Sequence, residues 1–438
     1  MNRNGRGGKD AVYKPVDIIE VRLWNRLVGA VALDPKVGYY AFEYAPAFLN
    51  SGIELAPIAM PLAEAATPFI FPDLPELTYR RLPAVLADAL PDDFGNLLIN
   101  AWMANQGVAP RDITALDRLA YMGKRGMGAL EFRPMRGPYT QKPTALELAT
   151  LVENARRVVH GKLEDDRDAM AALKQILSVG TSAGGARAKA AIAWNPQTNE
   201  IRTGQFGVDA GFEHWLLKFD GIGKDSELGE SQGYGRIEYG YHLMATQAGI
   251  DMSVCRLLEE NGRAHFMTKR FDRYGNSKVH MQTLCGIAQL DYRAKAVHDY
   301  SQLLGTMRQL KLPHTAFEQA FRRIAFNVMA ANCDDHTKNT SFLLRAEHGW
   351  ELAPAYDLIF AHNPQGEWTY QHLMSVNGKF TDITRADLLV LADRFQIGSA
   401  PSLLSDVRRA IDAWPQFAQD AGVAEASIKR IRHELVML

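Results

Sequence analysis

The stretch NCDDHTKN (332–339) directly follows an apolar segment with helical spacing, AFRRIAFNVMAA (320–331). Within it, Asp334 and Asn339 have the D-x-x-x-x-N spacing of kinase catalytic loops. In those loops the aspartate accepts the proton of the acceptor hydroxyl and the asparagine binds a metal ion. The stretch therefore indicates a phosphotransfer loop at the end of a helix, although alone it also fits a polar loop that caps a helix.

A second carboxylate follows downstream. Tyr356-Asp357 comes after two short apolar runs that are typical of strands, SFLLR (341–345) and WELAP (350–354). Mg²⁺ is a hard cation that prefers oxygen ligands, and it usually takes one or two carboxylates together with phosphate oxygens. An aspartate delivered by a strand end beside the first loop therefore predicts a magnesium–nucleotide site.

Three upstream features fit the same kind of site. GGARAK (184–189) is a small-residue loop whose backbone can approach phosphates closely, Lys218 lies in an apolar strand, and Glu238 lies on the next helix, where it could orient that lysine. Taken alone, a loop like 184–189 is more often an ordinary turn, a strand lysine like Lys218 is more often exposed, and a glutamate like Glu238 more often lies on a solvated helix face. Their order, followed by Asp334 and the metal ligands, is the order in protein kinases. Order and spacing together favour an ATP- and Mg²⁺-dependent phosphotransferase.

The composition is that of an ordinary globular chain. Its 438 residues predict two or three domains at roughly 150 residues each. The 49 basic and 50 acidic residues leave a net charge of −1. That balance argues against a protein whose whole surface binds nucleic acid or anionic lipid, but it allows one local basic patch.

Cysteine usage and hydropathy indicate the compartment. Cys255, Cys285 and Cys333 match no zinc or redox motif, and their odd number makes a disulfide framework improbable. No apolar run approaches the 18 or so residues that span a bilayer, and the first residues contain no apolar signal segment. We therefore expect a cytoplasmic protein without a membrane partner.

The chain divides best near RPMRGPYTQKPT (133–144). We expect a flexible tail over 1–16, a subdomain over 17–140, a nucleotide-binding part over 141–296 and a helical catalytic lobe over 297–438. The predicted fold class is α+β, a protein-kinase-like two-lobed fold with a strand-rich N-terminal part and a mostly helical C-terminal lobe. The expected elements are a hairpin around Trp24-Asn25-Arg26, a strand at 39–44, two helices over 78–120 divided by Pro91, two helices over 144–178, a strand after 188, strands at 214–220, 254–260 and 263–271, and a helix at 235–250.

Nearly the whole chain resembles the HipA-type serine/threonine kinases, the toxins of bacterial type II toxin–antitoxin modules. The resemblance is specific in DDHTKN (334–339) together with AYDL (355–358), and weaker in the other motifs. Those other motifs are ADALPDDFGNLLI (87–99) and LDRLAYMGKRGMGALEF (116–132) in the N-terminal part, SAGGARAK (182–189) as the phosphate loop, HWLLKFD (214–220) as the lysine strand and KRFDR (269–273) as the adenine hinge.

The resemblance implies a role for each matching residue. Asp334 would accept the proton, Asn339 and Asp357 would hold Mg²⁺, and Lys218 would contact the phosphates of ATP. Ser182 would be the loop serine whose autophosphorylation displaces the loop and silences the kinase, since a phosphate adds about −1.5 to −2 charge there. The other implied ATP-binding residues are Gly184, Gly185, Ala186, Arg187, Ala188 and Lys189 over the phosphates, Lys269, Arg270 and Phe271 at adenine, and His336, Thr337, Lys338 and Tyr356 along the pocket.

The chain departs from the family pattern at three places. Ser178 and Thr181 stand close to Ser182, so the modified hydroxyl is open among the three. Asp335 occupies a position where glycine is common, and we expect its carboxylate to face solvent rather than to repel phosphate. Lys269 is basic where the best-known member is acidic, which matters little if the hinge contact is made by backbone.

The resemblance also implies partners. The expected acceptor is a protein, with an aminoacyl-tRNA synthetase as the leading candidate because phosphorylating it would stall translation. A small helix-turn-helix antitoxin is the expected partner, and DNA would be contacted indirectly through it. Two alternatives remain: a catalytically silent corepressor, which the intact Asp334, Asn339 and Asp357 disfavour, and a small-molecule phosphotransferase, which the N-terminal resemblance disfavours.

Overall fold

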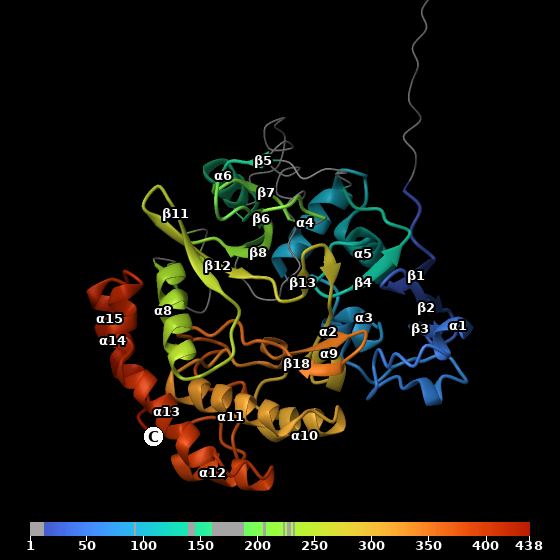
Figure 1. The fold of residues 1–438 in the computed structure, drawn as a ribbon. Coiled ribbons are helices and arrows are strands. Elements are labelled where there is room, and N and C mark those ends of the chain that lie inside the picture. Colours follow the sequence, from blue (N-terminus) through green and yellow to red (C-terminus); the bar gives the residue numbers. More distant parts are fainter. Residues whose placement is uncertain are drawn as a thin grey trace, which may run out of the picture.

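The computed structural model describes residues 13–91, 93–138, 145–159, 188–204, 207–221, 224–225, 229–230 and 233–438 (Figure 1). In Figure 1 the N-terminal sheet lies at the right, a larger sheet at the top, and the C-terminal helices along the bottom and left. Helices and strands both contribute throughout, which confirms the expected mixture of α and β structure.

The N-terminal sheet is antiparallel in the order β3-β2-β1-β4. Its hairpin turns through Trp24 and Asn25, whose φ angles of 49° and 65° are those of a two-residue type I′ turn. The alternation of apolar side chains along the first strand buries one face, as the period of a strand requires. The hairpin prediction is confirmed. The strands are β1 (Ile18–Leu23), β2 (Arg26–Asp34), β3 (Tyr39–Tyr44) and β4 (Leu130–Arg133).

Helices connect the third strand of this sheet to the fourth, and the first and last of them pack against the sheet. The expected break at Pro91 is present, and the second helix begins at Asp93. The helix before it has only four residues, Ala84–Ala87, because the chain turns before the proline, which disfavours helical backbone in the preceding residue. The helices are α1 (Pro46–Leu49), α2 (Glu76–Tyr79), α3 (Ala84–Ala87), α4 (Asp93–Ala104) and α5 (Ala115–Met122).

The larger sheet has six strands in the order β11-β12-β8-β6-β7-β5. In its antiparallel register Lys189 on β6 lies directly opposite Lys218 on β8, so both side chains point to the same face. The predicted strands at 214–220, 254–260 and 263–271 are confirmed to within a few residues. The strands are β5 (Ala145–Leu146), β6 (Lys189–Trp194), β7 (Ile201–Thr203), β8 (Glu213–Lys218), β11 (Cys255–Glu260) and β12 (Arg263–Lys269), with helices α6 (Leu148–Val159) and α8 (Tyr234–Gln247).

The C-terminal part is mainly helical. Helix α11 (His314–Met329) ends just before the NCDDHTKN stretch, and strands β17 (Ser341–Arg345) and β18 (Gly349–Leu352) follow it, as the spacing predicts. The other helices are α9 (Leu284–Ala288), α10 (Tyr300–Gln309), α12 (Arg385–Arg394), α13 (Ala400–Asp412), α14 (Trp414–Asp420) and α15 (Glu425–Glu434). The short strands are β9 (Lys224–Asp225), β10 (Gly229–Glu230), β13 (Arg273–Tyr274), β14 (Ser277–Lys278), β15 (His280–Thr283), β16 (His298–Asp299) and β19 (Met374–Ser375).

Two large hydrophobic clusters organise the described residues. One joins the N-terminal sheet to the six-stranded sheet and contains Phe132 and Trp215. The other holds α8 and the C-terminal helices together around Tyr241, Phe326 and Trp414. The predicted domain boundaries at 16, 140 and 296 stay predictions. No helix in the described ranges has the length and apolarity that crossing a membrane requires.

Several predicted features lie outside the described residues. They include the modifiable hydroxyls, most of the phosphate loop, the second helix expected before residue 178, and most of the first 16 residues. The predictions concerned are those for Ser178, Thr181, Ser182, Gly184, Gly185, Ala186 and Arg187.

Candidate active site

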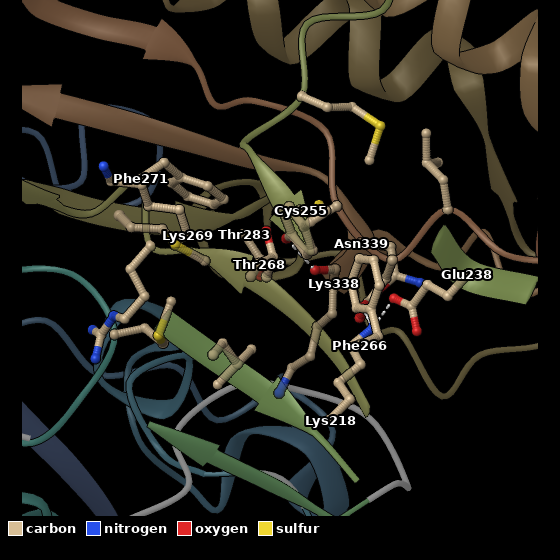
Figure 2. Close-up of a pocket in the computed structure, with 18 of the residues that line it drawn as sticks. Lys218, Glu238, Cys255, Phe266, Thr268, Lys269, Phe271, Thr283, Lys338 and Asn339 are labelled. Atoms are coloured by element: carbon tan, nitrogen blue, oxygen red, sulfur yellow. Dashed lines mark hydrogen bonds and ion pairs between the residues drawn. The ribbon is translucent and has the colours of Figure 1, made fainter. Parts of the chain in front are cut away.

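A pocket opens between strands β8 and β12 on one side and the segments 338–339 and 356–358 on the other (Figure 2). It encloses about 1050 Å³, including space open to solvent. The lining is apolar at Leu216 and Phe271 and charged at Lys218 and Asp357. An apolar chamber with one charged end suits a ligand that has a flat apolar part and an anionic part. Nine site residues named from the sequence line this pocket: Lys218, Glu238, Lys269, Arg270, Phe271, Lys338, Asn339, Tyr356 and Asp357.

Lys218 is the centre of the charged end. Its ammonium group donates to the carboxylates of Glu238, on helix α8, and of Asp357. Burial alone would lower the pKa of Lys218, but the two carboxylates outweigh burial and raise it. The lysine is therefore a cation at neutral pH. Glu238 stands where the sequence predicted a lysine-orienting carboxylate, and Asp357, predicted as a metal ligand, joins the same cluster.

Asp357 is held in an uncommon backbone conformation. Its φ of 53° lies in the left-handed region, which aspartate tolerates better than most residues. Residues held in this conformation are common at functional sites. Burial would raise the pKa of the Asp357 carboxyl, but Lys218 and Lys189 reverse that effect and hold it below the usual range. Asp357 is thus an anion at neutral pH, as a metal ligand must be.

Lys189 places a second cation near Asp357, although it does not itself line the pocket. It is buried on β6 directly opposite Lys218, and its charge acts on Asp357. From the sequence, Lys189 appeared only as the last residue of the phosphate loop. The sheet register makes Lys189 a direct neighbour of Lys218, because residues directly opposite each other on antiparallel strands share a face.

Asp334 lies beside the pocket and does not line it. Its side chain is 47% exposed, and its Oδ1 is 3.7 Å from Nε2 of His336. Nδ2 of Asn339 donates to the backbone oxygen of Asp334 over 2.6 Å, which closes the turn between them. This bond directs the amide nitrogen of Asn339 into the turn and leaves its carbonyl oxygen as the oxygen available to a metal.

The donor set fits Mg²⁺. Asn339 supplies one amide oxygen and Asp357 one ionised carboxylate, and both line the same pocket. Hard oxygen donors in such small number are typical of a magnesium ion whose other ligands are water and phosphate oxygens. Within the described residues no cluster of three or more His, Cys, Asp or Glu side chains suits a metal held by protein alone.

The expectation that Asp335 faces solvent is wrong. Its carboxylate is fully buried and accepts bonds from the Tyr300 hydroxyl (2.7 Å) and the Leu373 N–H (2.7 Å), and its Oδ2 lies 2.9 Å from Nδ1 of His372. Asp335 therefore ties the loop 332–339 to helix α10 and to the segment around residue 373. The side chain of its neighbour Asp334, in contrast, is 47% exposed.

Replacing Asp335 by alanine should lower the free energy of unfolding by about 3 kcal/mol, because it leaves the Leu373 N–H and the Tyr300 hydroxyl buried without an acceptor. Thermal and urea unfolding of the variant beside the parent protein would measure the loss. Asp393→Ala, at an exposed position on helix α12, is the matched control. A loss no larger than that of the control would contradict the anchoring role.

Tyr356 connects the two halves of the catalytic segment. Its buried hydroxyl donates to the backbone oxygen of Lys338 over 2.6 Å and lies 2.5 Å from Oγ of Ser341. Burial raises the pKa of this hydroxyl, so Tyr356 remains protonated and acts as a donor. Thr337, also named from the sequence, is buried and donates to the backbone oxygen of Leu290 instead of lining the pocket. His336 and Ala188 likewise lie outside the lining.

The apolar end of the pocket includes the predicted adenine hinge. The N–H groups of Lys269 and Arg270 already donate to the backbone oxygens of Val254 and His214. A backbone contact with adenine would therefore involve the Lys269 carbonyl and the Phe271 N–H. The Lys269 ammonium points to Glu213, 2.6 Å away, so its charge is satisfied outside the hinge backbone.

The N-terminal part supplies lining residues that the sequence did not reveal: Asp88, Ala89, Leu90 and Met127. Both oxygens of Asp88 accept bonds from Thr283, one from its N–H and one from its hydroxyl, each over 2.7 Å. They lie within the stretches 87–99 and 116–132 that resemble the family, but nothing in those stretches indicated that these residues would line the pocket.

A buried ion cluster fastens the N-terminal part to the hinge. Asp272 lies between Arg270 and Arg273 and also accepts the N–H of Gly128 over 2.7 Å. Arg273 in turn donates to the backbone oxygens of Gly126 and Gly128. The KRFDR motif therefore contributes its side chains to the attachment of the N-terminal part as well as lining the pocket.

Comparison with known proteins places the chain among relatives. A family model described as the HipA-like C-terminal domain matches residues 181–436, and one described as the HipA N-terminal domain matches residues 19–133. Among solved structures, the HipA–HipB–operator DNA complex of the Shewanella oneidensis MR-1 toxin–antitoxin system contains a chain that is similar with a TM-score of 0.66 and 18% identity, covering 95% of this chain and 94% of that one.

A second solved structure is more distant. The Helicobacter pylori proinflammatory kinase CtkA matches with a TM-score of 0.32 and 11% identity over 51% of this chain and 85% of its own, too weak a likeness to support an argument. No curated protein matches the sequence.

Proposed function

Because this chain belongs to the HipA family, we propose that it is an ATP- and Mg²⁺-dependent kinase that phosphorylates a serine or threonine of a protein. One observation carries the proposal: Lys218, Glu238 and Asp357 form a buried charge cluster at the end of a large apolar pocket, next to Asn339. Such a cluster suits the phosphates of a nucleotide whose base occupies the apolar end.

The proposed reaction uses positioning and charge neutralisation, as phosphoryl transfer generally does. Mg²⁺, held by Asn339 and Asp357, would neutralise charge on the phosphates. Lys218, oriented by Glu238, and Lys189 beside it would bind phosphate oxygens. Asp334, exposed and in the same loop as the lining residues Lys338 and Asn339, would orient the acceptor hydroxyl and take its proton, while the phosphoryl group passes in line from ATP to that oxygen.

The finer expectations belong to the same proposal. The sheet β11-β12-β8-β6-β7-β5 and the helices around α11 would be the two lobes of a kinase-like fold, with the pocket between them. Autophosphorylation of Ser182, or of Ser178 or Thr181, would place a phosphate where the loop must approach ATP, and the added charge would keep the loop out of the site.

The partners follow from the relative. The Shewanella oneidensis HipA structure is a complex with HipB and operator DNA. A helix-turn-helix antitoxin that brings this chain to DNA indirectly is therefore the proposed partner. The proposed acceptor is an aminoacyl-tRNA synthetase.

Mass spectrometry tests the proposal most directly. The unphosphorylated protein, incubated with ATP and Mg²⁺, should gain one phosphate, about 80 Da, within residues 178–182, and an Asp334→Ala control should gain none. Phosphate on that segment in both proteins would remove Asp334 from the mechanism. If protein that is shown to bind ATP gains no phosphate, the result would favour a silent corepressor or a small-molecule phosphotransferase instead.

A further inference from the structure

A group of cations gathers around one aromatic ring beside the catalytic loop. The ring belongs to Tyr292, in the segment between α9 and β16. The Lys338 ammonium lies 4.6 Å and the Arg293 guanidinium 5.1 Å from its centroid. The ring of His336, whose Nε2 is 3.7 Å from Asp334, lies 5.6 Å from the same ring. The cations are therefore next to the proposed proton acceptor.

The N-terminal part extends this group. Arg80 follows helix α2 with a φ of 52°, and burial together with the like charge of Arg293 lowers its pKa. Arg118, on α5, donates to the side-chain oxygens of Asn96 and Asn100 over 2.8 and 2.9 Å. Burial and then the charge of Arg80 lower the pKa of Arg118 to about 10. We call Arg80, Arg118, Arg293 and Lys338 the cationic strip: Arg293 and Lys338 meet at the Tyr292 ring, and the charges of Arg80 and Arg118 act on their neighbours in the group.

Few ion pairs balance the strip, although the Asp88 carboxylate, which also lines the pocket, interacts electrostatically with Lys338. Among the described side chains, Arg80, Arg118 and Lys338 form no ion pair within 4.0 Å, and Arg293 has a single long one, 3.4 Å to Asp93, whose side chain is 75% exposed. Nε of Arg293 and Nδ1 of His336 are buried without a hydrogen-bond partner in the described structure. Cations held together by burial, with unused donor capacity, are typical of a site that binds an anion.

We propose that the cationic strip binds acidic residues of the protein acceptor beside the hydroxyl that receives the phosphate. The inference rests on the proposed kinase function and adds a sequence preference to it. Carboxylates on an acceptor segment would pair with Arg293 and Arg80 while its serine or threonine reaches Asp334. The N-terminal part would then contribute to acceptor selection as well as to the pocket wall.

A nucleic acid fits the strip less well than an acidic peptide. Binding single strands generally uses aromatic faces on which bases stack, but the Tyr292 ring already has two cations against it. A phosphate backbone also needs a longer run of cations than these four. A short acidic peptide needs only two or three paired side chains.

Peptide binding tests the proposal without requiring catalysis. Two fluorescein-labelled peptides of equal length carry a central serine flanked either by glutamates or by lysines, and fluorescence anisotropy with the full-length protein gives their affinities. The glutamate peptide should bind at least about tenfold more tightly, and Arg293→Glu and Arg80→Glu should each weaken it about tenfold. Salt should weaken this binding as well.

Controls separate the strip from general charge and from misfolding. Arg409→Glu, at an exposed position on α13, should leave peptide binding unchanged. MgATP affinity and thermal unfolding of the strip variants should match those of the parent, and Arg293→Gln serves if Arg293→Glu does not fold. Equal affinity for the two peptides, or full binding by the folded variants, would overturn the proposal. The proposal would also be overturned if a single-stranded RNA of the same length bound more tightly than the glutamate peptide and Arg293→Glu abolished that RNA binding.

Phosphotransfer to the same peptides distinguishes the two proposals. If the glutamate peptide binds through the strip but is never phosphorylated with MgATP, the kinase function fails while the anion-binding strip stands. If both peptides are phosphorylated with equal kcat/KM, the kinase function stands and the acceptor preference fails.

Discussion

Asp334→Asn is expected to reduce phosphotransfer about 10²–10⁴-fold, the usual contribution of a general base, while leaving thermal unfolding and MgATP binding unchanged. The amide keeps the size of the carboxylate but cannot accept the proton of the acceptor hydroxyl. The fold should tolerate it because the side chain is 47% exposed, and Asn339 bonds to the backbone oxygen of this residue and not to its carboxylate. Radiolabelled phosphotransfer under single-turnover conditions, beside nucleotide-binding titrations, measures both quantities.

The adjacent carboxylate provides the matched control. Asp335→Asn changes the same functional group one residue further along, but at a buried anchor. It should lower the unfolding temperature, whereas Asp334→Asn should not. Near-parental turnover by Asp334→Asn would eliminate this residue as the proton acceptor. A fall in stability equal to that of Asp335→Asn would mean that its effect on activity arises from the fold.

The second large effect is expected at the metal end of the pocket. Asp357→Asn should lower kcat/KM on the order of 10³-fold or more. It removes the negative charge of the only anionic ligand proposed for Mg²⁺, so the metal ion that would neutralise the phosphates should bind more weakly. Glu238→Gln should cost only about 10–100-fold, as substitutions of groups that orient a primary ligand usually do. The two variants are well matched, since each converts to an amide a carboxylate that accepts a bond from Lys218.

Magnesium dependence discriminates between the roles of these two carboxylates. In Asp357→Asn the Mg²⁺ concentration that gives half-maximal nucleotide binding should rise sharply. Glu238→Gln should change the nucleotide affinity but leave that Mg²⁺ concentration as it is in the parent protein. Identical Mg²⁺ dependence in the two variants would show that Asp357 acts through Lys218 and does not hold the metal.

The pH dependence of the free energy of unfolding should reflect the ion pair between Asp357 and Lys218. The pKa of Asp357 is lowered in the folded protein, so its contribution is present above the unfolded pKa, about 4, and is lost as pH falls through the lower folded value. The pKa of Lys218 is raised, so its contribution is present below about 10.4 and is lost as pH rises through the higher folded value. Relative to the parent, Asp357→Asn should therefore show weaker pH dependence of unfolding at the acid end.

Much of the candidate site could be proposed from the sequence because its patterns are local. The spacing of Asp334 and Asn339, the strands that precede Asp357, and Lys218 within an apolar strand are all patterns within short stretches. Hydrophobic alternation and turn chemistry likewise predicted the hairpin at Trp24-Asn25, since period and turn type depend on neighbouring residues. The family resemblance of the N- and C-terminal parts was equally available from the sequence and is confirmed by the family models.

What the sequence could not determine was which distant segments meet. Asp335 was expected at the surface, and it is buried because the segment around residue 373 supplies donors to its carboxylate. Asp88 reaches the pocket through Thr283, and Arg80 approaches Tyr292, across long separations in the chain. Local pattern shows what a side chain can do, but burial and charge pairing depend on packing between segments. That packing is decided by the whole hydrophobic core, so only the tertiary structure revealed the anchor, the N-terminal wall of the pocket and the cationic strip.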